Sequence, residues 1–283
     1  MISIGFMQGR LSPMIDNRIQ SFPWKGWQKE FEIASKNNIN TIEWTIDDDQ
    51  LYENPLLTEK GIQEINSLTK KYQINIPSLT GDCFMQKPFW KSIGAQKEKL
   101  QNDFINILHG CSKANISIVL IPLVDNGSIE NDLQENNLLT FLSSQTELLK
   151  KLSVRVCFES DFPPKKLKDF IDRYDDDLFG INYDTGNSAS MGFDPSEEFL
   201  QYGDRIINIH IKDRPLGGTT VPLGEGDTNF SLIFRMLKEH DYHGNLILQT
   251  ARAKDNDHLS VLKNYHNITM EHAKKIGLPV NIS

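Results

Sequence analysis

Residues 206–213 read IINIHIKD, an isoleucine-rich run that holds His210 and stops at Lys212 and Asp213. A short apolar run with polar residues at its end is typical of a buried strand in a parallel sheet. Seven similar runs recur along the chain, so the sequence predicts eight strands. The runs are ISIGF (2–6), NTIEW (40–44), INIPSL (74–79), ISIVLIP (116–122), VRVCF (154–158), FGINY (179–183), IINIHI (206–211) and NLILQ (245–249).

Amphipathic stretches separate these runs, as helices do in an α/β fold. Residues 27–38 place Trp27, Phe31 and Ala34 on one helical face. Eight strand–helix units in 283 residues predict a (β/α)8 TIM barrel. An open doubly wound sheet has the same alternation, but no GxGxxG follows the first run. The expected helices cover 27–38, 58–72, 96–114, 135–152, 164–174, 196–203, 229–242 and roughly 258–276.

No internal repeat, low-complexity tract or linker divides the chain, so residues 1–283 are expected to form one domain. The net charge of −8 disfavours nucleic-acid binding, which relies on basic faces. The three cysteines are widely spaced without a CxxC pair, so we expect reduced thiols. The chain begins without a signal-peptide pattern and has no run of roughly 18 apolar residues, which predicts a soluble cytoplasmic protein with no membrane partner.

In a TIM barrel the active site lies where the strands end, so the residues at these ends are the candidates for function. The last four runs end near Glu159, Asp184, His210 and Gln249, which are 25, 26 and 39 residues apart and so recur once per unit. The candidates at all eight ends are Met7 to Arg10, Glu43, Thr80 to Asp82, Leu123 to Asp125, Glu159 with Asp161, Asp184 with Asn187, His210 with Lys212 and Asp213, and Gln249 with Arg252.

Two carboxylates, an imidazole and an amide oxygen are suitable ligands for Mn²⁺, Mg²⁺, Co²⁺ or Zn²⁺. Each residue alone has an ordinary explanation. Asp184 is also placed to cap the following helix, and a single strand histidine is usually a satisfied core group. Their joint position favours a shared polar site, because buried charges without partners are costly.

Four segments and the eighth apolar run (245–249) resemble the xylose-isomerase-like barrels. The segments are CFESD (157–161), GINYDTGN (180–187), NIHIKDR (208–214) and VPLGEGDTNF (221–230). This family includes sugar and sugar-phosphate isomerases and 3-epimerases related to D-tagatose 3-epimerase. The resemblance implies a divalent metal, Mn²⁺ first, held by Glu159, Asp184 and His210. It also implies that Glu159 is a catalytic acid/base group, that Glu43 contacts substrate, and that a homo-oligomer is compatible with the chain.

Gln249 departs from the family pattern, because the epimerases have a second Glu there that acts on the opposite face of the sugar. A glutamine oxygen can still coordinate a metal, but it cannot take a proton. Three outcomes stay open. Glu159 works alone in an aldose–ketose isomerisation. Another group supplies the second proton, with Asp161, Asp213, Asp82 and Cys83 as candidates. In the third outcome, the chain binds a sugar without turning it over.

Cationic residues follow the first, seventh and eighth runs, which suits an anionic substrate such as a sugar phosphate. Each of them can equally pair with a nearby carboxylate.

A keto-sugar or inosose dehydratase shares the proton abstraction and is the closest alternative. An endonuclease IV-like repair enzyme would need more histidines at the strand ends, and a non-catalytic sugar-binding barrel needs no base. The predicted substrate contacts are Arg10, Glu43, Lys212, Arg214 and Arg252.

Overall fold

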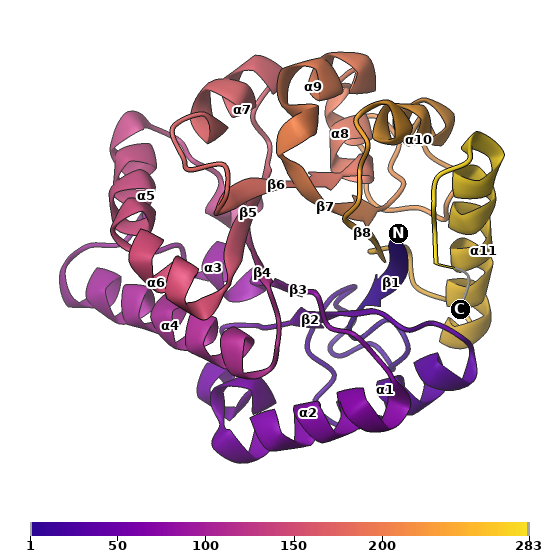
Figure 1. Ribbon diagram of the computed structural model, residues 1–283, viewed down its shortest axis with the longest axis horizontal. Coiled ribbons are helices and arrows are strands. Elements are labelled where there is room, and N and C mark those ends of the chain that lie inside the picture. Colours follow the sequence, from indigo (N-terminus) through magenta and orange to yellow (C-terminus); the bar gives the residue numbers. More distant parts are fainter. Residues whose placement is uncertain (1, 282–283) are drawn as a thin grey trace.

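The computed structural model describes residues 2–281, which form a closed barrel of eight parallel strands surrounded by helices (Figure 1). The strands pair in chain order, and β8 closes the ring by pairing with β1. This confirms the predicted TIM barrel as a single domain. Its predicted limits, 1 and 283, lie outside the described residues. The strands are β1 (Ser3–Met7), β2 (Ile42–Thr45), β3 (Ser78–Thr80), β4 (Ile118–Leu123), β5 (Arg155–Ser160), β6 (Phe179–Asp184), β7 (Ile206–Ile211) and β8 (Asn245–Leu248).

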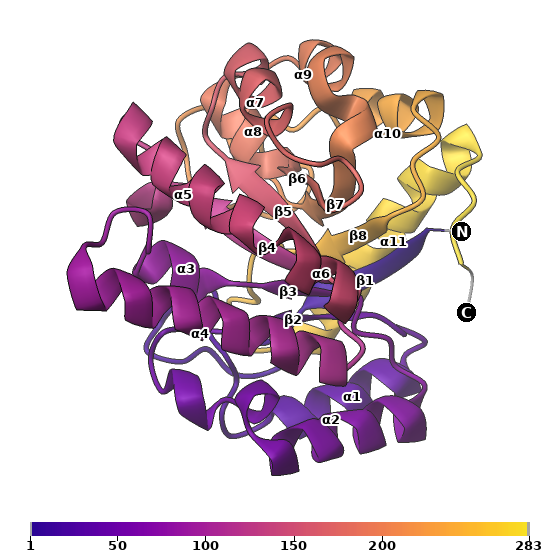
Figure 2. The same ribbon diagram turned by 60° about the vertical axis from the view of Figure 1, so that its left-hand side comes forward.

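The helices surround the barrel, as the turned view in Figure 2 also shows, and their apolar residues pack against it. In α10, for example, Phe230, Ile233, Phe234 and Leu237 are buried at the spacing of one helical face. The helices are α1 (Trp27–Lys36), α2 (Glu59–Tyr72), α3 (Asp82–Gln86), α4 (Gly94–Lys113), α5 (Asp132–Ser144), α6 (Thr146–Leu152), α7 (Pro164–Ile171), α8 (Thr185–Met191), α9 (Pro195–Tyr202), α10 (Phe230–Glu239) and α11 (His258–Ile276).

Three local segments differ from the sequence prediction. The expected third strand at 74–79 is reduced to β3, because Pro77 has no N–H for the sheet. The expected helix at 135–152 is two helices, α5 and α6, which meet at Gln145. Asp184 caps an unpredicted helix, α8, and accepts hydrogen bonds from the backbone N–H groups of Gly186 and Asn187.

The interior of the barrel changes from apolar to polar along its axis. Ile118, Leu120 and Cys157 form a small buried cluster within it. Further along the strands, polar side chains replace them at alternate positions: Asn182 precedes Asp184 on β6, and Asn208 precedes His210 on β7. Residues two apart on a strand point to the same face. The candidate site therefore stands on a layer of buried polar groups.

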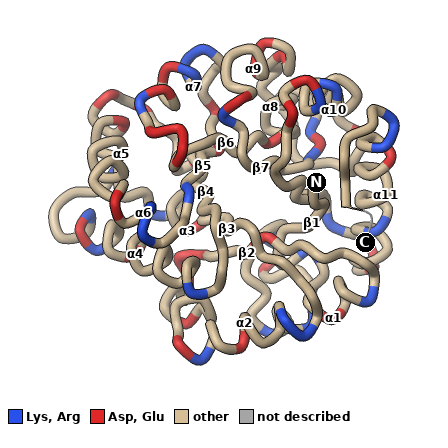
Figure 3. Tube along the Cα trace, viewed as in Figure 1, with Lys and Arg blue, Asp and Glu red and all other residues tan. Residues whose placement is uncertain are grey.

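The exterior is mixed in charge, with basic and acidic residues interspersed around the ring of helices (Figure 3). All three cysteines are free, as the sequence predicted, and all three are buried. Within residues 2–281, no helix combines the length and the apolar character needed to cross a membrane.

Candidate functional site

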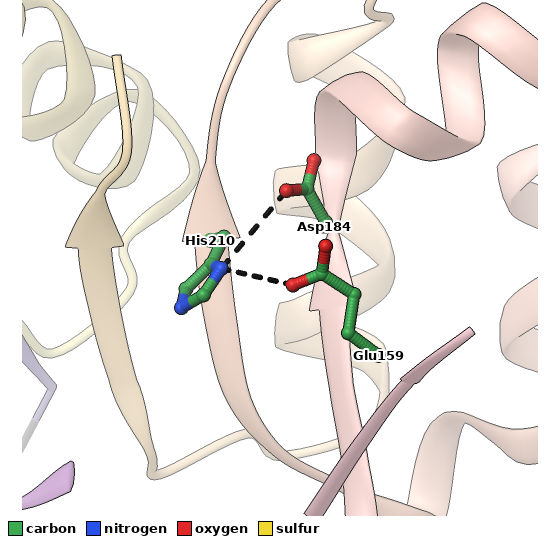
Figure 4. A group of neighbouring side chains, drawn as sticks. All are labelled: Glu159, Asp184 and His210. Carbon is green, nitrogen blue, oxygen red and sulfur yellow. Dashed lines mark ion pairs between the residues drawn. The ribbon is translucent and has the colours of Figure 1, made fainter. Parts of the chain in front are cut away.

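Glu159, Asp184 and His210 meet at the carboxyl ends of three adjacent strands, β5, β6 and β7 (Figure 4). The imidazole Nδ1 of His210 lies 3.1 Å from Glu159 Oε2 and 3.9 Å from Asp184 Oδ2. The pairing register of the sheet explains part of this proximity, because Asp184 and His210 are direct neighbours across β6 and β7. The three residues are therefore brought together as the sequence predicted.

His210 is held from below by Glu43, whose Oε1 lies 2.7 Å from the imidazole Nε2. The other oxygen of Glu43 accepts hydrogen bonds from Ser78 Oγ, at 2.7 Å, and from Asn208 Nδ2, at 2.9 Å. Glu43 has no exposed surface. The structure thus places it beneath the site and not at the mouth, where the predicted substrate contact would need it. Its position suits it to fix the ring so that Nδ1 faces Glu159 and Asp184.

Two amide side chains hold Glu159, and neither was assigned a role from the sequence. Asn182 Nδ2 donates to Glu159 Oε2 at 2.9 Å, and Asn187 Nδ2 donates to Glu159 Oε1 at 2.6 Å. The strand alternation in GINYD could have revealed Asn182, which lies two residues before Asp184. The sequence showed Asn187 as a polar residue after the sixth run, but it did not indicate that Asn187 contacts Glu159.

The charges of this cluster shift its protonation in opposite directions. Burial alone would lower the pKa of His210, but the carboxylates of Glu43 and Glu159 outweigh it and raise that pKa to about 10. Burial alone would raise the pKa of Glu159, but the charges of His210 and Lys212 outweigh it and lower that pKa. The carboxylates thus favour a proton on His210, so a metal ligated by Nδ1 would compete with a proton for that nitrogen.

Gln249 lies at the end of β8 and contacts Lys212 instead of the His210 ring. Its Oε1 accepts a hydrogen bond from Lys212 Nζ at 2.9 Å, and its Nε2 donates to Gln20 Oε1 at 3.0 Å. The same ammonium lies 3.1 Å from Asp184 Oδ2. The lack of a side chain at Gly186 leaves room for Lys212, because a Cβ at position 186 would lie only 2.7 Å from the Lys212 side chain. A cation therefore already bridges Asp184 and Gln249.

A cavity of about 610 Å³ opens above the cluster and is large enough for a small sugar. Of the predicted site residues, Glu159, Lys212, Arg214 and Gln249 line it. Arg214 Nη1 donates to Asn187 Oδ1 at 2.7 Å, while its Nε and Nη2 donate to the Gly218 carbonyl. Other cavity residues include Arg18, Gln20, Asp82, Asp125 and Asp161, of which Gln20 lay in a stretch without a sequence signal.

Arg10 and Arg252 do not line this cavity, although both were predicted to contact substrate. Arg10 Nε donates to the Thr250 carbonyl at 3.1 Å, and its Nη1 donates to the Ile19 carbonyl at 2.8 Å. Arg252 donates to the carbonyls of Gly9 and Ser12. Both guanidinium groups therefore tie the segments after β1 and β8 together.

The glycine-flanked loop LGEG, considered as a phosphate site, is bound by the protein itself. Asp213 Oδ2 accepts from the backbone N–H groups of Gly224, at 2.7 Å, and Gly226, at 3.0 Å, and its Oδ1 accepts from that of Thr228, at 3.1 Å. These donors are directed at a carboxylate, so the loop does not offer them to a phosphate. Asp213 is likewise occupied and does not line the cavity.

The donor set fits a divalent metal. Nδ1 of His210 is buried and has no hydrogen-bond partner in the described part of the chain, although two carboxylate oxygens face it. Two oxygens and an imidazole nitrogen are the ligands that Mn²⁺, Co²⁺ or Zn²⁺ accept. A buried carboxylate on the far nitrogen, as Glu43 provides, is typical of metal-bound histidines.

Comparison with known proteins places the chain in a defined group. Residues 31–266 match the family model described as the xylose isomerase-like TIM barrel. An inosose dehydratase from Clostridium tetani is 24% identical over 155 residues, covering 46% of this chain and 52% of that protein. The chain thus spans about half the length of the first curated relatives it matches. The L-ribulose-5-phosphate 3-epimerase UlaE from Escherichia coli is 20% identical over 236 residues, covering 79% of this chain and 81% of that one.

Solved structures share the fold along nearly the whole chain. The D-allulose 3-epimerase from Methylomonas sp. has a TM-score of 0.76 and 14% identity, covering 96% of this chain and 98% of that one. The IolI protein with a bound zinc atom has a TM-score of 0.76 and 13% identity, covering 97% and 99%. At these identities the likeness concerns the fold alone.

Proposed function

Because the chain belongs to the xylose isomerase-like TIM-barrel family, we propose that it is a metal-dependent sugar or sugar-phosphate isomerase or epimerase. The observation that carries the proposal is the buried group of Glu159, Asp184 and His210, of which Glu159 lines a sugar-sized cavity. The relatives named as 3-epimerases and the zinc-bearing IolI neighbour support it.

Glu159, Asp184 and His210 would hold the ion, with Mn²⁺ first and Mg²⁺, Co²⁺ or Zn²⁺ as alternatives. Bound there, a divalent ion polarises the carbonyl and hydroxyl oxygens of a sugar. Gln249 offers a neutral oxygen as a fourth ligand, but only after Lys212 releases it.

Glu159 is the group that removes the proton next to the sugar carbonyl. It borders the cavity, and the amides of Asn182 and Asn187 fix its carboxylate. Lys212 and Arg214 border the same cavity and would bind the oxygens or the anionic group of the substrate. The product is the ketose, aldose or epimer that results when the proton returns.

A dehydratase is the second candidate, because several inosose dehydratases are among the relatives of this chain. It would use the same proton removal, followed by loss of the neighbouring hydroxyl as water. A barrel that only binds sugar is the remaining alternative. It would bind the substrate without exchanging any carbon-bound hydrogen.

The first experiment is the metal content of the purified protein by inductively coupled plasma mass spectrometry, before and after Mn²⁺ is added. We expect about one ion per chain in the wild type and loss of that ion in His210→Ala. A His240→Ala variant is the matched control, because His240 lies after α10 and pairs with Asp204, away from the cavity. Equal metal content in all three proteins would refute the site.

The second experiment follows deuterium uptake from D₂O into D-tagatose, D-allulose, L-ribulose 5-phosphate and inosose in the presence of Mn²⁺. Glu159→Gln keeps the shape of the side chain but removes the base, so exchange and turnover should fall by at least about 10²-fold. Exchange near the wild-type rate in this variant would remove Glu159 from the mechanism. An unsaturated product from inosose would favour the dehydratase.

A further inference from the structure

We propose that Asp82 is the second proton-transfer group of this cavity, a role that the amide of Gln249 cannot fill. Asp82 would deliver a proton to the substrate carbon from which Glu159 has removed one, on the opposite face. The proposal rests on the proposed function, since it requires Glu159 to act as the base.

Asp82 shares a cavity with Glu159. It follows β3 directly, begins α3 and borders the same cavity as Glu159, which comes from β5. Its side chain is largely buried, with 7% of the residue exposed. Both carboxyl groups thus reach one sugar-sized space, but from different strands of the barrel.

Gln249 supports Asp82 through a chain of two amide hydrogen bonds. Gln249 Nε2 donates to Gln20 Oε1 at 3.0 Å, and Gln20 Nε2 donates to Asp82 Oδ2 at 2.6 Å. Amides hold a carboxyl in place without adding a cation. Gln249 cannot transfer a proton itself, but through Gln20 it helps to orient Asp82.

No ion pair fixes Asp82 in its charged form among residues 2–281. Asp184, by contrast, lies 3.1 Å from the ammonium of Lys212. A carboxyl group that is buried without a cation holds its proton more strongly. Asp82 is therefore able to enter the reaction as an acid.

The electrostatic surroundings of Asp82 agree with this role. Burial, followed by the charge of Asp47 from the segment after β2, raises its pKa to about 7. The hydrogen bond from Gln20 works in the opposite direction, Glu159 adds to the increase, and His210 reduces it. A group that titrates near neutral pH can give a proton in one direction of a reversible reaction and take one in the other.

The other acids near the mouth are less suited to this role. Asp161 accepts a hydrogen bond from Ser128 Oγ at 2.5 Å, and Asp213 accepts three from the loop after β7. Burial holds the pKa of the Cys83 thiol well above its ordinary value, so it would be a poor acid.

The chemical step is balanced without any further reactant. Glu159 takes the proton next to the carbonyl, and the C–H electron pair moves into the carbonyl to give an enediolate. Asp82 gives its proton to the same carbon from the other face, and the pair returns to form the new C–H bond. Glu159 is left protonated and Asp82 ionised, and proton exchange with water restores both. The product is the epimer of the substrate.

The test separates proton removal from proton delivery by using Asp82→Asn with the four sugars named above, Mn²⁺ and D₂O. Glu159 should still exchange the substrate hydrogen, at a rate within about tenfold of wild type. Epimer formation should fall by about 10²- to 10⁴-fold, the range expected for loss of an acid/base group. Asp82→Glu should recover part of this loss, because it restores a carboxyl.

Asp48→Asn is the matched control, because Asp48 lies near Asp47, pairs with Lys87 and does not border the cavity. It should leave both rates unchanged. Circular dichroism verifies folding, and Asp82→Ser provides the same readout if Asp82→Asn does not fold.

Three outcomes would overturn the proposal. Undiminished epimer formation in folded Asp82→Asn would show that Asp82 is not needed. An equal loss of exchange and epimer formation would indicate that it only maintains the cavity. If the wild type exchanges no hydrogen of any sugar, the proposed function fails and the role of Asp82 fails with it. In the first two cases the function of Glu159 is retained.

Discussion

The two sides of the cavity hold their carboxyl groups in different ways. On the metal side, formed by Glu159, Asp184 and His210, a positive group lies near each carboxylate. On the amide side, Asp82 accepts a hydrogen bond from the neutral amide of Gln20, which Gln249 contacts in turn. Cationic partners thus lie beside the carboxylates of one side, whereas an amide is the partner of Asp82 on the other. The difference indicates that burial alone does not set the chemistry of a carboxyl group; its partners do.

The largest effect expected from this comparison is on stability as pH changes. The pKa of Asp82 is raised to about 7 in the folded protein from an ordinary value of 3.8, so the folded state binds its proton more tightly. The unfolding free energy should therefore fall as pH rises from about 4 to about 7, by roughly 4 kcal/mol at most.

Asp82→Asn removes this titration, so the variant should gain stability relative to wild type as pH rises through that window. Urea denaturation in the presence of EDTA, at pH 4.5 and pH 8, measures how the difference in unfolding free energy between the two proteins changes with pH. If the difference in unfolding free energy between variant and wild type is the same at both pH values, Asp82 ionises normally. The comparison between the two sides of the cavity would then fail.

A smaller effect is expected beneath the metal side. Glu43→Gln replaces the carboxylate on His210 Nε2 with an amide and leaves Ser78 and Asn208 facing a changed partner. Metal affinity should fall about 10- to 100-fold, as for other groups that orient a ligating histidine. Competition with a metal-sensitive dye measures this, and the Asp48→Asn variant serves as the control. Unchanged affinity would mean that Glu43 acts only in packing.

The smallest effect is expected where the two sides meet. Gln249→Glu adds a carboxylate, but Lys212 already contacts this position and would partly neutralise it. We expect metal binding to tighten by no more than about tenfold, because an opposing cation offsets the added charge. The same dye titration tests this. If affinity does not change, Gln249 lies outside the ligand set and belongs to the amide side alone.

Much of the fold was predictable from the sequence because it depends on local patterns. Eight apolar runs separated by amphipathic stretches define a barrel, and the hydrophobic driving force acts on that pattern directly. Where local rules conflicted, the prediction was less accurate. Pro77 shortened the third strand, and the segment after Asp184 became a helix because the same carboxylate that faces His210 also caps it.

The sequence by itself determined the barrel and the meeting of Glu159, Asp184 and His210, because consecutive parallel strands end at the same edge. Only the tertiary structure decided the partners of each polar group. It placed Glu43 under His210, turned Arg10 and Arg252 to backbone carbonyls, and linked Gln249 to Asp82 through Gln20. These contacts join residues as far as 243 positions apart, and their side-chain directions depend on packing that no local pattern records.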